Sequence, residues 1–208
     1  MDKTTHYLCR NSSLKGVPIG GAPSWDVAQK VCLVDVVTGK TPFHNTCFQI
    51  VRDDIQAKLF VRFERDTKQI YSNFRLHDEP LWKQDVFELF ICDENSTDTY
   101  KELQSSPWDI RFDGIISYDK QGNRHLNVSW DALGWESLSH FDKVKKKLTS
   151  VWSIPYDALS SRPKPGKSWR LGVFAINQLE NNQDLLSWQK VGIPNFHVPD
   201  CFGYLDFE

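Results

Sequence analysis

The feature that most constrains the fold is a series of short β-rich runs separated by turn residues. Aromatic and β-branched residues recur within the runs, and glycine, proline, asparagine and aspartate fall between them, which is the pattern of strands joined by tight loops. The runs lie at residues 47–52, 57–64, 86–92, 108–118, 124–130, 149–154, 169–177 and 204–207. Many strands at short spacing, without intervening helices, favour an antiparallel sandwich over an α/β fold.

Local signals agree with this interpretation. The segment DKQGN at residues 119–123 supplies the glycine and asparagine that tight hairpin loops require. The best candidate helix is residues 137–147, where Leu138, Phe141 and Val144 recur at helical spacing in a narrow apolar stripe. We therefore predict an all-β fold, an antiparallel two-sheet β-sandwich of jelly-roll or immunoglobulin-like type, with at most one or two short helices.

The length of the chain indicates one domain. A chain of 208 residues with 40% hydrophobic content can bury one substantial core, so we expect a single domain over residues 1–208. Residues 1–23 are polar and punctuated by glycine and proline. We expect them to form an irregular N-terminal arm laid over that core.

Charge and composition limit the partners. The 25 Lys and Arg nearly balance the 27 Asp and Glu, so no overall field attracts nucleic acid or a membrane, and neither is expected as a partner. The N-terminal sequence lacks the apolar region of a signal peptide, and a cytoplasmic location is expected. The five cysteines are scattered without a C-x-x-C pair, which predicts reduced thiols. His44, His77 and His125 have no partner at metal-ligand spacing, so no metal or other cofactor is expected.

One strand run carries the most informative motif. In PLWKQDVFELFI, residues 80–91, a tryptophan in a turn precedes a strand in which Glu88 shares one face with Val86 and Phe90. Further motifs follow along the chain: YKELQSSP at 100–107, SIPYDAL at 153–159, PKPGKSWR at 163–170 and NFHVPDCFGYLDF at 195–207. In this order they resemble the family-nine carbohydrate-binding modules and their wider DOMON-like relatives. In that family the corresponding strand follows a Trp-x-x-Asp turn and bears a similarly placed glutamate.

The resemblance implies a ligand slot between two aromatic side chains, one before the Glu-bearing strand and one in the last loop. By position these are Trp82 and Phe196, and Glu88 would accept hydrogen bonds from sugar hydroxyls. Gln104 and His197 are added from their neighbourhood in the motifs. The sequence departs from the family by having Phe196 where a second indole is usual, and by lacking an arginine near Gln104. The expected slot therefore has less stacking area and a weaker donor.

Such a slot suits the chemistry of a sugar. Sugar rings present C–H groups on their faces and hydroxyls at their rims, so aromatic surfaces can hold the faces while polar groups bind the rim. We therefore predict non-catalytic binding of a mono- or oligosaccharide, without a cofactor.

Structural roles for the same residues stay open at this point. Trp82 could pack in the core or in its turn. Glu88 could form an ion pair with Arg111 on a neighbouring strand, since an ionised carboxylate inside an apolar strand needs a partner. Phe196 could close one end of the sandwich.

Other functions also stay open. Glu88, Glu102 and Asp113 are candidate carboxylates for glycoside hydrolysis, but no nucleophile elbow, metal cluster or phosphate-binding loop accompanies them. Met/His haem ligation is disfavoured because the only methionine is Met1. The main alternative is a protein-interaction module, or a sensor of another small ligand, on the same fold.

Overall fold

The computed structural model describes residues 5–12, 23–93, 97–180 and 182–208. The strands are β1 (His6–Asn11), β2 (Val31–Cys32), β3 (Val34–Asp35), β4 (Thr46–Asp53), β5 (Lys58–Asp66), β6 (Val86–Cys92), β7 (Thr99–Ser105), β8 (Arg111–Tyr118), β9 (Arg124–Asn127), β10 (Glu136–Asp142), β11 (Lys147–Pro155), β12 (Ser168–Gln178), β13 (Gln183–Ser187) and β14 (Gly203–Phe207). Short 3-10 helices are η2 (Trp25–Val27), η3 (Leu81–Lys83), η4 (Tyr156–Ala158) and η5 (Pro199–Cys201). The all-β prediction is confirmed, and each predicted run overlaps a strand. In the described segments no helix has the length and apolarity to cross a bilayer.

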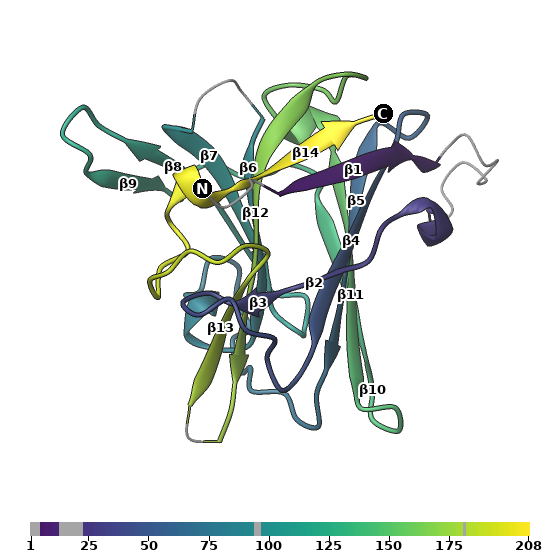
Figure 1. The fold of residues 1–208 in the computed structure, drawn as a ribbon, viewed down its shortest axis with the longest axis vertical. Coiled ribbons are helices and arrows are strands. Elements are labelled where there is room, and N and C mark those ends of the chain that lie inside the picture. The colour runs from purple at the N-terminus through teal and green to yellow at the C-terminus, as the bar shows by residue number, and fades with distance from the viewer. Residues whose placement is uncertain (1–4, 13–22, 94–96, 181) are drawn as a thin grey trace.

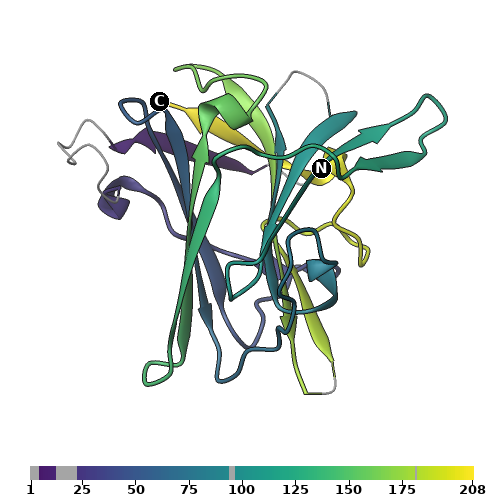
Figure 2. The ribbon, with the colours of Figure 1, turned by 180° about the vertical axis from the view of Figure 1, so that it is seen from behind.

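The strands form a large mixed sheet. Hydrogen-bonded neighbours follow the order β10-β11-β5-β4-β1-β14-β12-β6-β7-β8-β9, with β2 beside β4 and β13 beside β12 and β3. Figures 1 and 2 show β4, β5 and β11 on one side of the molecule and β6, β12 and β13 on the other. Most pairs are antiparallel, but β1 is parallel to both β14 and β4. The purely antiparallel arrangement is therefore wrong at β1, and the jelly-roll or immunoglobulin-like form stays a prediction.

Strand β6 lies between two apolar clusters. Phe63 of β5 stacks on Phe87 of β6 with ring centroids 4.7 Å apart, which places one cluster between the two sides. Every residue of β6 is buried. Because alternate side chains point to opposite faces, Phe87 and Leu89 join this inner cluster, whereas Val86 and Phe90 join a second cluster on the outer face. The candidate site lies against this outer cluster.

The helix expected over residues 137–147 is wrong, because the segment forms a β-hairpin. Strand β10 pairs antiparallel with β11 over its whole length. In the turn, Asp142 Oδ1 accepts hydrogen bonds from the backbone N–H groups of Val144 and Lys145, a local bond that favours chain reversal. Leu138, which would anchor a helical apolar face, is 74% exposed. The hydrogen bonds with β11 therefore stabilise this segment as a strand more than its narrow apolar stripe could stabilise it as a helix.

Part of the expected irregular arm is a regular strand. Side chains of β1 alternate between exposed and buried, and Tyr7 is completely buried. The Tyr7 hydroxyl donates to the carbonyl of Gln29 at 2.7 Å and accepts from the backbone N–H of Ile50 at 2.7 Å. The prediction of an irregular arm is therefore wrong for residues 6–11, while residues 1–4 and 13–22 lie outside the described segments.

Two of the cysteines are bonded. Cys32 and Cys47 form a disulfide between β2 and β4, whereas Cys9, Cys92 and Cys201 are free thiols. The prediction of reduced thiols is therefore wrong for this pair. The two residues lie directly opposite each other in the ladder, a contact that their spacing in the sequence does not reveal.

Candidate functional site

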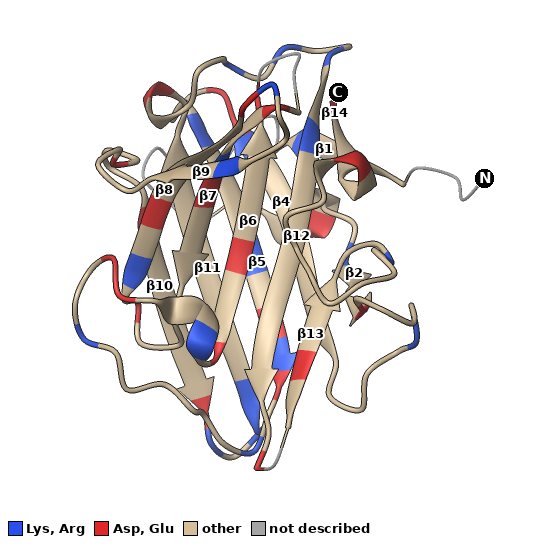
Figure 3. Ribbon diagram, turned by 90° about the vertical axis from the view of Figure 1, so that its left-hand side faces the viewer, with Lys and Arg blue, Asp and Glu red and all other residues tan. Residues whose placement is uncertain are grey.

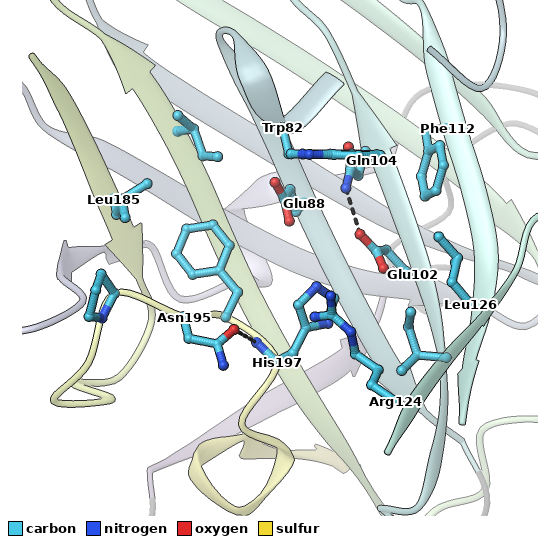
Figure 4. Close-up of a pocket in the computed structure, with 14 residues that line it drawn as sticks. Trp82, Glu88, Glu102, Gln104, Phe112, Arg124, Leu126, Leu185, Asn195 and His197 are labelled. Carbon is cyan, nitrogen blue, oxygen red and sulfur yellow. Dashed lines mark hydrogen bonds between the residues drawn. The ribbon is translucent and has the colours of Figure 1, made fainter. Parts of the chain in front are cut away.

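All five residues predicted for the site line one cavity. Its volume is about 340 Å³. Trp82 comes from η3, Glu88 from β6, Gln104 from β7, and Phe196 and His197 from the loop before η5. Figure 4 shows Glu88 between Trp82 on one side and His197 on the other. The remaining lining residues are Glu102, Phe112, Ile116, Arg124, Leu126, Ile176, Leu185, Pro194 and Asn195.

The polar floor of the cavity follows from strand register, and Figure 3 shows acidic positions on β6 and β7. Glu88 lies opposite Gln104 in the β6–β7 ladder, and Glu102 shares the face of Gln104 because it lies two residues before it. Gln104 Nε2 donates a 2.6 Å hydrogen bond to Glu102 Oε1. Glu88 Oε1 and Gln104 Oε1 are buried and have no hydrogen-bond partner among the described residues. Since buried polar atoms are normally paired, these oxygens are acceptors open to a ligand.

The ion pair considered between Glu88 and Arg111 is wrong. Arg111 donates to the backbone carbonyl of Trp135 instead, and its guanidinium lies 5.5 Å from the centroid of the Trp135 ring. Arg111 therefore does not neutralise the carboxyl group of Glu88, a residue that is only 2% exposed.

The two carboxyl groups of the floor favour their protonated forms. Burial raises the pKa of Glu88 well above its usual value, and the charge of Glu102 raises it further. Burial also raises the pKa of Glu102 to about 7, although the hydrogen bond from Gln104 and the charge of Arg124 act in the opposite direction. Two neighbouring carboxylates resist ionising together in a dry site. Glu88 therefore holds a proton near neutral pH and can donate a hydrogen bond as well as accept one.

This arrangement predicts a pH dependence of stability. Between about pH 5 and pH 7 the folded protein holds protons on these carboxyls that the unfolded chain has lost, so the free energy of unfolding falls as the pH rises. Glu102→Gln should remove the part of that slope that Glu102 contributes, a change on the order of 1–3 kcal/mol across the window, while the part that comes from the burial of Glu88 remains. Urea denaturation at a series of pH values measures it, and Glu136→Gln at an exposed position is the control. Equal slopes in wild type and Glu102→Gln would contradict the assignment.

Trp82 is presented by a buried neighbour. Leu81 is completely buried and belongs to the outer apolar cluster, whereas Trp82 is 40% exposed. The Trp82 ring meets Phe112 edge-on, with centroids 5.4 Å apart and planes at 80°. A core position for Trp82 is therefore wrong, and much of the indole surface stays open to a ligand.

Asp85, the aspartate of the Trp-x-x-Asp turn that precedes β6, holds this turn in place. Its carboxylate is completely buried and accepts hydrogen bonds from Arg65 Nη2 at 2.8 Å, the N–H of Tyr71 at 2.7 Å and the N–H of Gln178 at 2.7 Å. These donors belong to β5, to the loop before η3 and to β12. One carboxylate thus fixes the loop that carries Trp82 to strands on both sides of the molecule.

Phe196 and His197 are mostly buried. Phe196 is 8% exposed and stacks on Phe174 with ring centroids 4.5 Å apart and planes at 17°. His197 Nδ1 lies 2.8 Å from the Tyr100 hydroxyl. Burial, aided by the charge of Arg124, lowers the pKa of His197 to about 3, so its imidazole is neutral. Phe196 has one ring face occupied by Phe174, and an opposed arrangement of Trp82 and Phe196 stays a prediction.

Arg124 is a charged lining residue that sequence reasoning missed. It pairs with Tyr118 across the hairpin turn at residues 119–123, and Leu126, two residues later on β9, also lines the cavity. The hairpin signal located β9 correctly. It did not show that β9 lines the same cavity as Gln104. From the sequence, no arginine was expected near Gln104. Glu102 and Asn195 also line the cavity and were likewise not among the predicted site residues.

The comparisons with known proteins concern the fold. Comparison by sequence with family models and with curated proteins finds no match. Among similar solved structures, a candidate carbohydrate-binding protein from Bacteroides uniformis ATCC 8492 has 19% identity and a TM-score of 0.69, over 99% of this chain and 97% of that chain. A family 9 carbohydrate-binding module from Caldicellulosiruptor kristjanssonii in complex with cellotriose has 12% identity and a TM-score of 0.61, over 98% and 94%. A family 9 module from that organism in complex with glucose has 13% identity and a TM-score of 0.62, over 98% and 96%.

Fold and cavity together define an all-β domain with a ligand-sized cavity on one sheet face. More narrowly, the chain has the fold of the family-nine carbohydrate-binding modules, as its motifs predicted. The wider DOMON-like relationship stays a prediction.

Proposed function

We propose that the cavity binds a short carbohydrate without converting it. The observation that carries this proposal is the pair of buried, unpaired oxygens, Glu88 Oε1 and Gln104 Oε1, in the same cavity as the exposed indole of Trp82. A sugar offers hydroxyl donors to the oxygens and a C–H face to the indole. The structural relatives in complex with cellotriose and glucose support the same class of ligand.

The lining residues divide the recognition between them. Trp82 stacks on one face of the sugar, and Phe196 contacts it from the last loop. Protonated Glu88 and the Gln104 side chain bind hydroxyls, and neutral His197 adds a polar contact. Arg124 supplies a charge-assisted hydrogen-bond donor. In the family this role belongs to an arginine near Gln104, which the sequence of this chain lacks at that place.

No covalent step belongs to this proposal. Hydrolysis of a glycosidic bond needs two carboxyl groups that flank the bond. Glu88 and Glu102 instead lie on neighbouring strands and point from the same face of the sheet, and Glu102 is engaged by Gln104. This arrangement places both carboxyl groups in a floor beneath a ligand.

The redox conditions matter for the experiment. A cytoplasmic location stays a prediction, but disulfides such as Cys32–Cys47 persist mainly in oxidising compartments. Binding should therefore be measured in a non-reducing buffer.

The test is calorimetric titration of the full chain with glucose, cellotriose and a panel of other mono- and oligosaccharides. We expect saturable one-to-one binding of at least one sugar and no release of reducing sugar on prolonged incubation. A chain that binds none of the panel saturably, or that releases reducing ends from an oligosaccharide, would contradict the proposal.

A further inference from the structure

A second group of side chains converges outside the sugar cavity. His77 and Asp78 lie in the loop between β5 and β6, Asp113 lies on β8, and Asp131 follows β9. One ligand atom from each of His77, Asp78 and Asp131 can be chosen so that all lie within 4.8 Å of one another. In the sequence His77 has no partner at metal-ligand spacing, and it is the fold that brings Asp131 close to it. None of these residues lines the sugar cavity.

Asp113 is a buried carboxylate that points into this group. It is 2% exposed, and its Oδ2 accepts from the backbone N–H of Ala132. Its Oδ1 has no hydrogen-bond partner in the described part of the chain, yet it lies 3.1 Å from His77 Nε2. The buried oxygen of Asp113 therefore faces the imidazole ring of His77.

The two ring nitrogens of His77 face different carboxylates. Its Nδ1 lies 3.0 Å from Asp78 Oδ2, and its Nε2 faces Asp113. A neutral imidazole carries only one N–H and cannot donate to both carboxylates. If Nε2–H donates to Asp113, Nδ1 presents a lone pair beside Asp78 and Asp131. Metal-bound histidines commonly have this arrangement, in which a carboxylate orients the ring through its other nitrogen.

We propose that His77 Nδ1, Asp78 and Asp131 bind a divalent transition-metal ion of the zinc type, with Asp113 as the positioning residue for His77. One nitrogen and two carboxylate ligands suit Zn²⁺ with solvent completing its coordination. Ca²⁺ and Mg²⁺ prefer sites made of oxygen alone. The ion would connect the loop before β6 to the segment after β9, the strand that carries Arg124.

The experiment uses the full chain after removal of metals with a chelator. Calorimetric titration with ZnCl₂ should show one site, and saturating Zn²⁺ should raise the melting temperature, because an ion that binds only the folded state stabilises it. His77→Ala and Asp131→Asn should each weaken binding at least about tenfold, and Asp113→Asn should weaken it about 10–100-fold. His125→Ala is the matched control, because His125 pairs with Asp119 at 3.2 Å on the surface elsewhere.

Several outcomes would overturn the proposal. Absence of Zn²⁺ binding by the wild type would show that the side chains of this group contact one another without holding an ion. Unchanged affinity in both His77→Ala and Asp131→Asn would move the ion to another site. Binding of CaCl₂ as tightly as ZnCl₂ would contradict the proposed class of metal. All of these measurements are made without sugar, so they are independent of the proposed carbohydrate binding.

Discussion

Trp82→Ala is expected to weaken sugar binding about thirtyfold, which corresponds to about 2 kcal/mol. The indole is the large exposed aromatic surface of the cavity, and its loss removes the platform for a sugar face. The variant should still fold, because the Trp82 side chain is 40% exposed and its ring meets the Phe112 ring only edge-on. Calorimetric titration measures the affinity, and urea denaturation checks stability.

Trp108→Ala is the matched control. Trp108 is 46% exposed, and its indole Nε1 donates to the carbonyl of Ser72 at 3.0 Å, but it does not line the cavity. Its removal should leave the sugar affinity unchanged. If Trp82→Ala keeps wild-type affinity, the indole is not the platform, and if both variants lose affinity equally, the sugar binds by a less specific aromatic surface.

Asp85→Ala is expected to lower the free energy of unfolding by about 3–5 kcal/mol. The substitution leaves the buried guanidinium of Arg65 without its carboxylate and removes the acceptor of the backbone N–H groups of Tyr71 and Gln178. Urea denaturation measures the loss. Sugar affinity should fall as well, because the turn that holds Trp82 loses its connection to β5 and β12.

The control for Asp85 is an exposed ion pair. Asp157 and Arg162 interact at 2.6 Å with side chains 83% and 61% exposed, so Asp157→Ala should cost less than about 1 kcal/mol. Asp85→Asn, which keeps one acceptor oxygen, serves if the alanine variant does not fold. A loss of stability no larger than that of Asp157→Ala would show that the buried pair does not hold the turn. Full sugar affinity in a destabilised Asp85 variant would show that Trp82 is positioned by other contacts.

The strands were largely predictable because their signals are local. Turn residues mark where the chain reverses, as at Asp119, whose Oδ1 accepts from the backbone N–H groups of Gln121 and Asn123 in the β8–β9 hairpin. Strands β2 and β3 have two residues each and are too short to show any periodicity. The failure at residues 137–147 has the opposite cause, since a weak helical pattern was present but β11 offered a full set of strand hydrogen bonds.

The site was predictable where a motif carried it and unpredictable where it depended on distant contacts. Trp82, Glu88 and Gln104 follow from a turn, a strand and its neighbour. The place of Arg124 in the cavity depends on how closely β9 approaches β8 at Gly114, where an added Cβ would lie 2.9 Å from Leu126 Cδ1. Because Gly114 has no side chain, Leu126 can lie close to the β8 backbone. No local sequence pattern predicts this contact. The disulfide and the cluster around His77 likewise join segments that are distant in the sequence.

The placement of β1 also has a kinetic consequence. His6 Nδ1 and Asp206 Oδ2 form a hydrogen bond between residues 200 positions apart, in a ladder that runs from His6 to Cys9. Closing so long a loop is entropically costly, and topologies rich in such contacts fold slowly. During synthesis on the ribosome, residues 6–9 must wait until residues 204–207 have emerged. Until then the growing chain presents an unpaired strand edge, so its greatest exposure to aggregation should precede completion of this ladder.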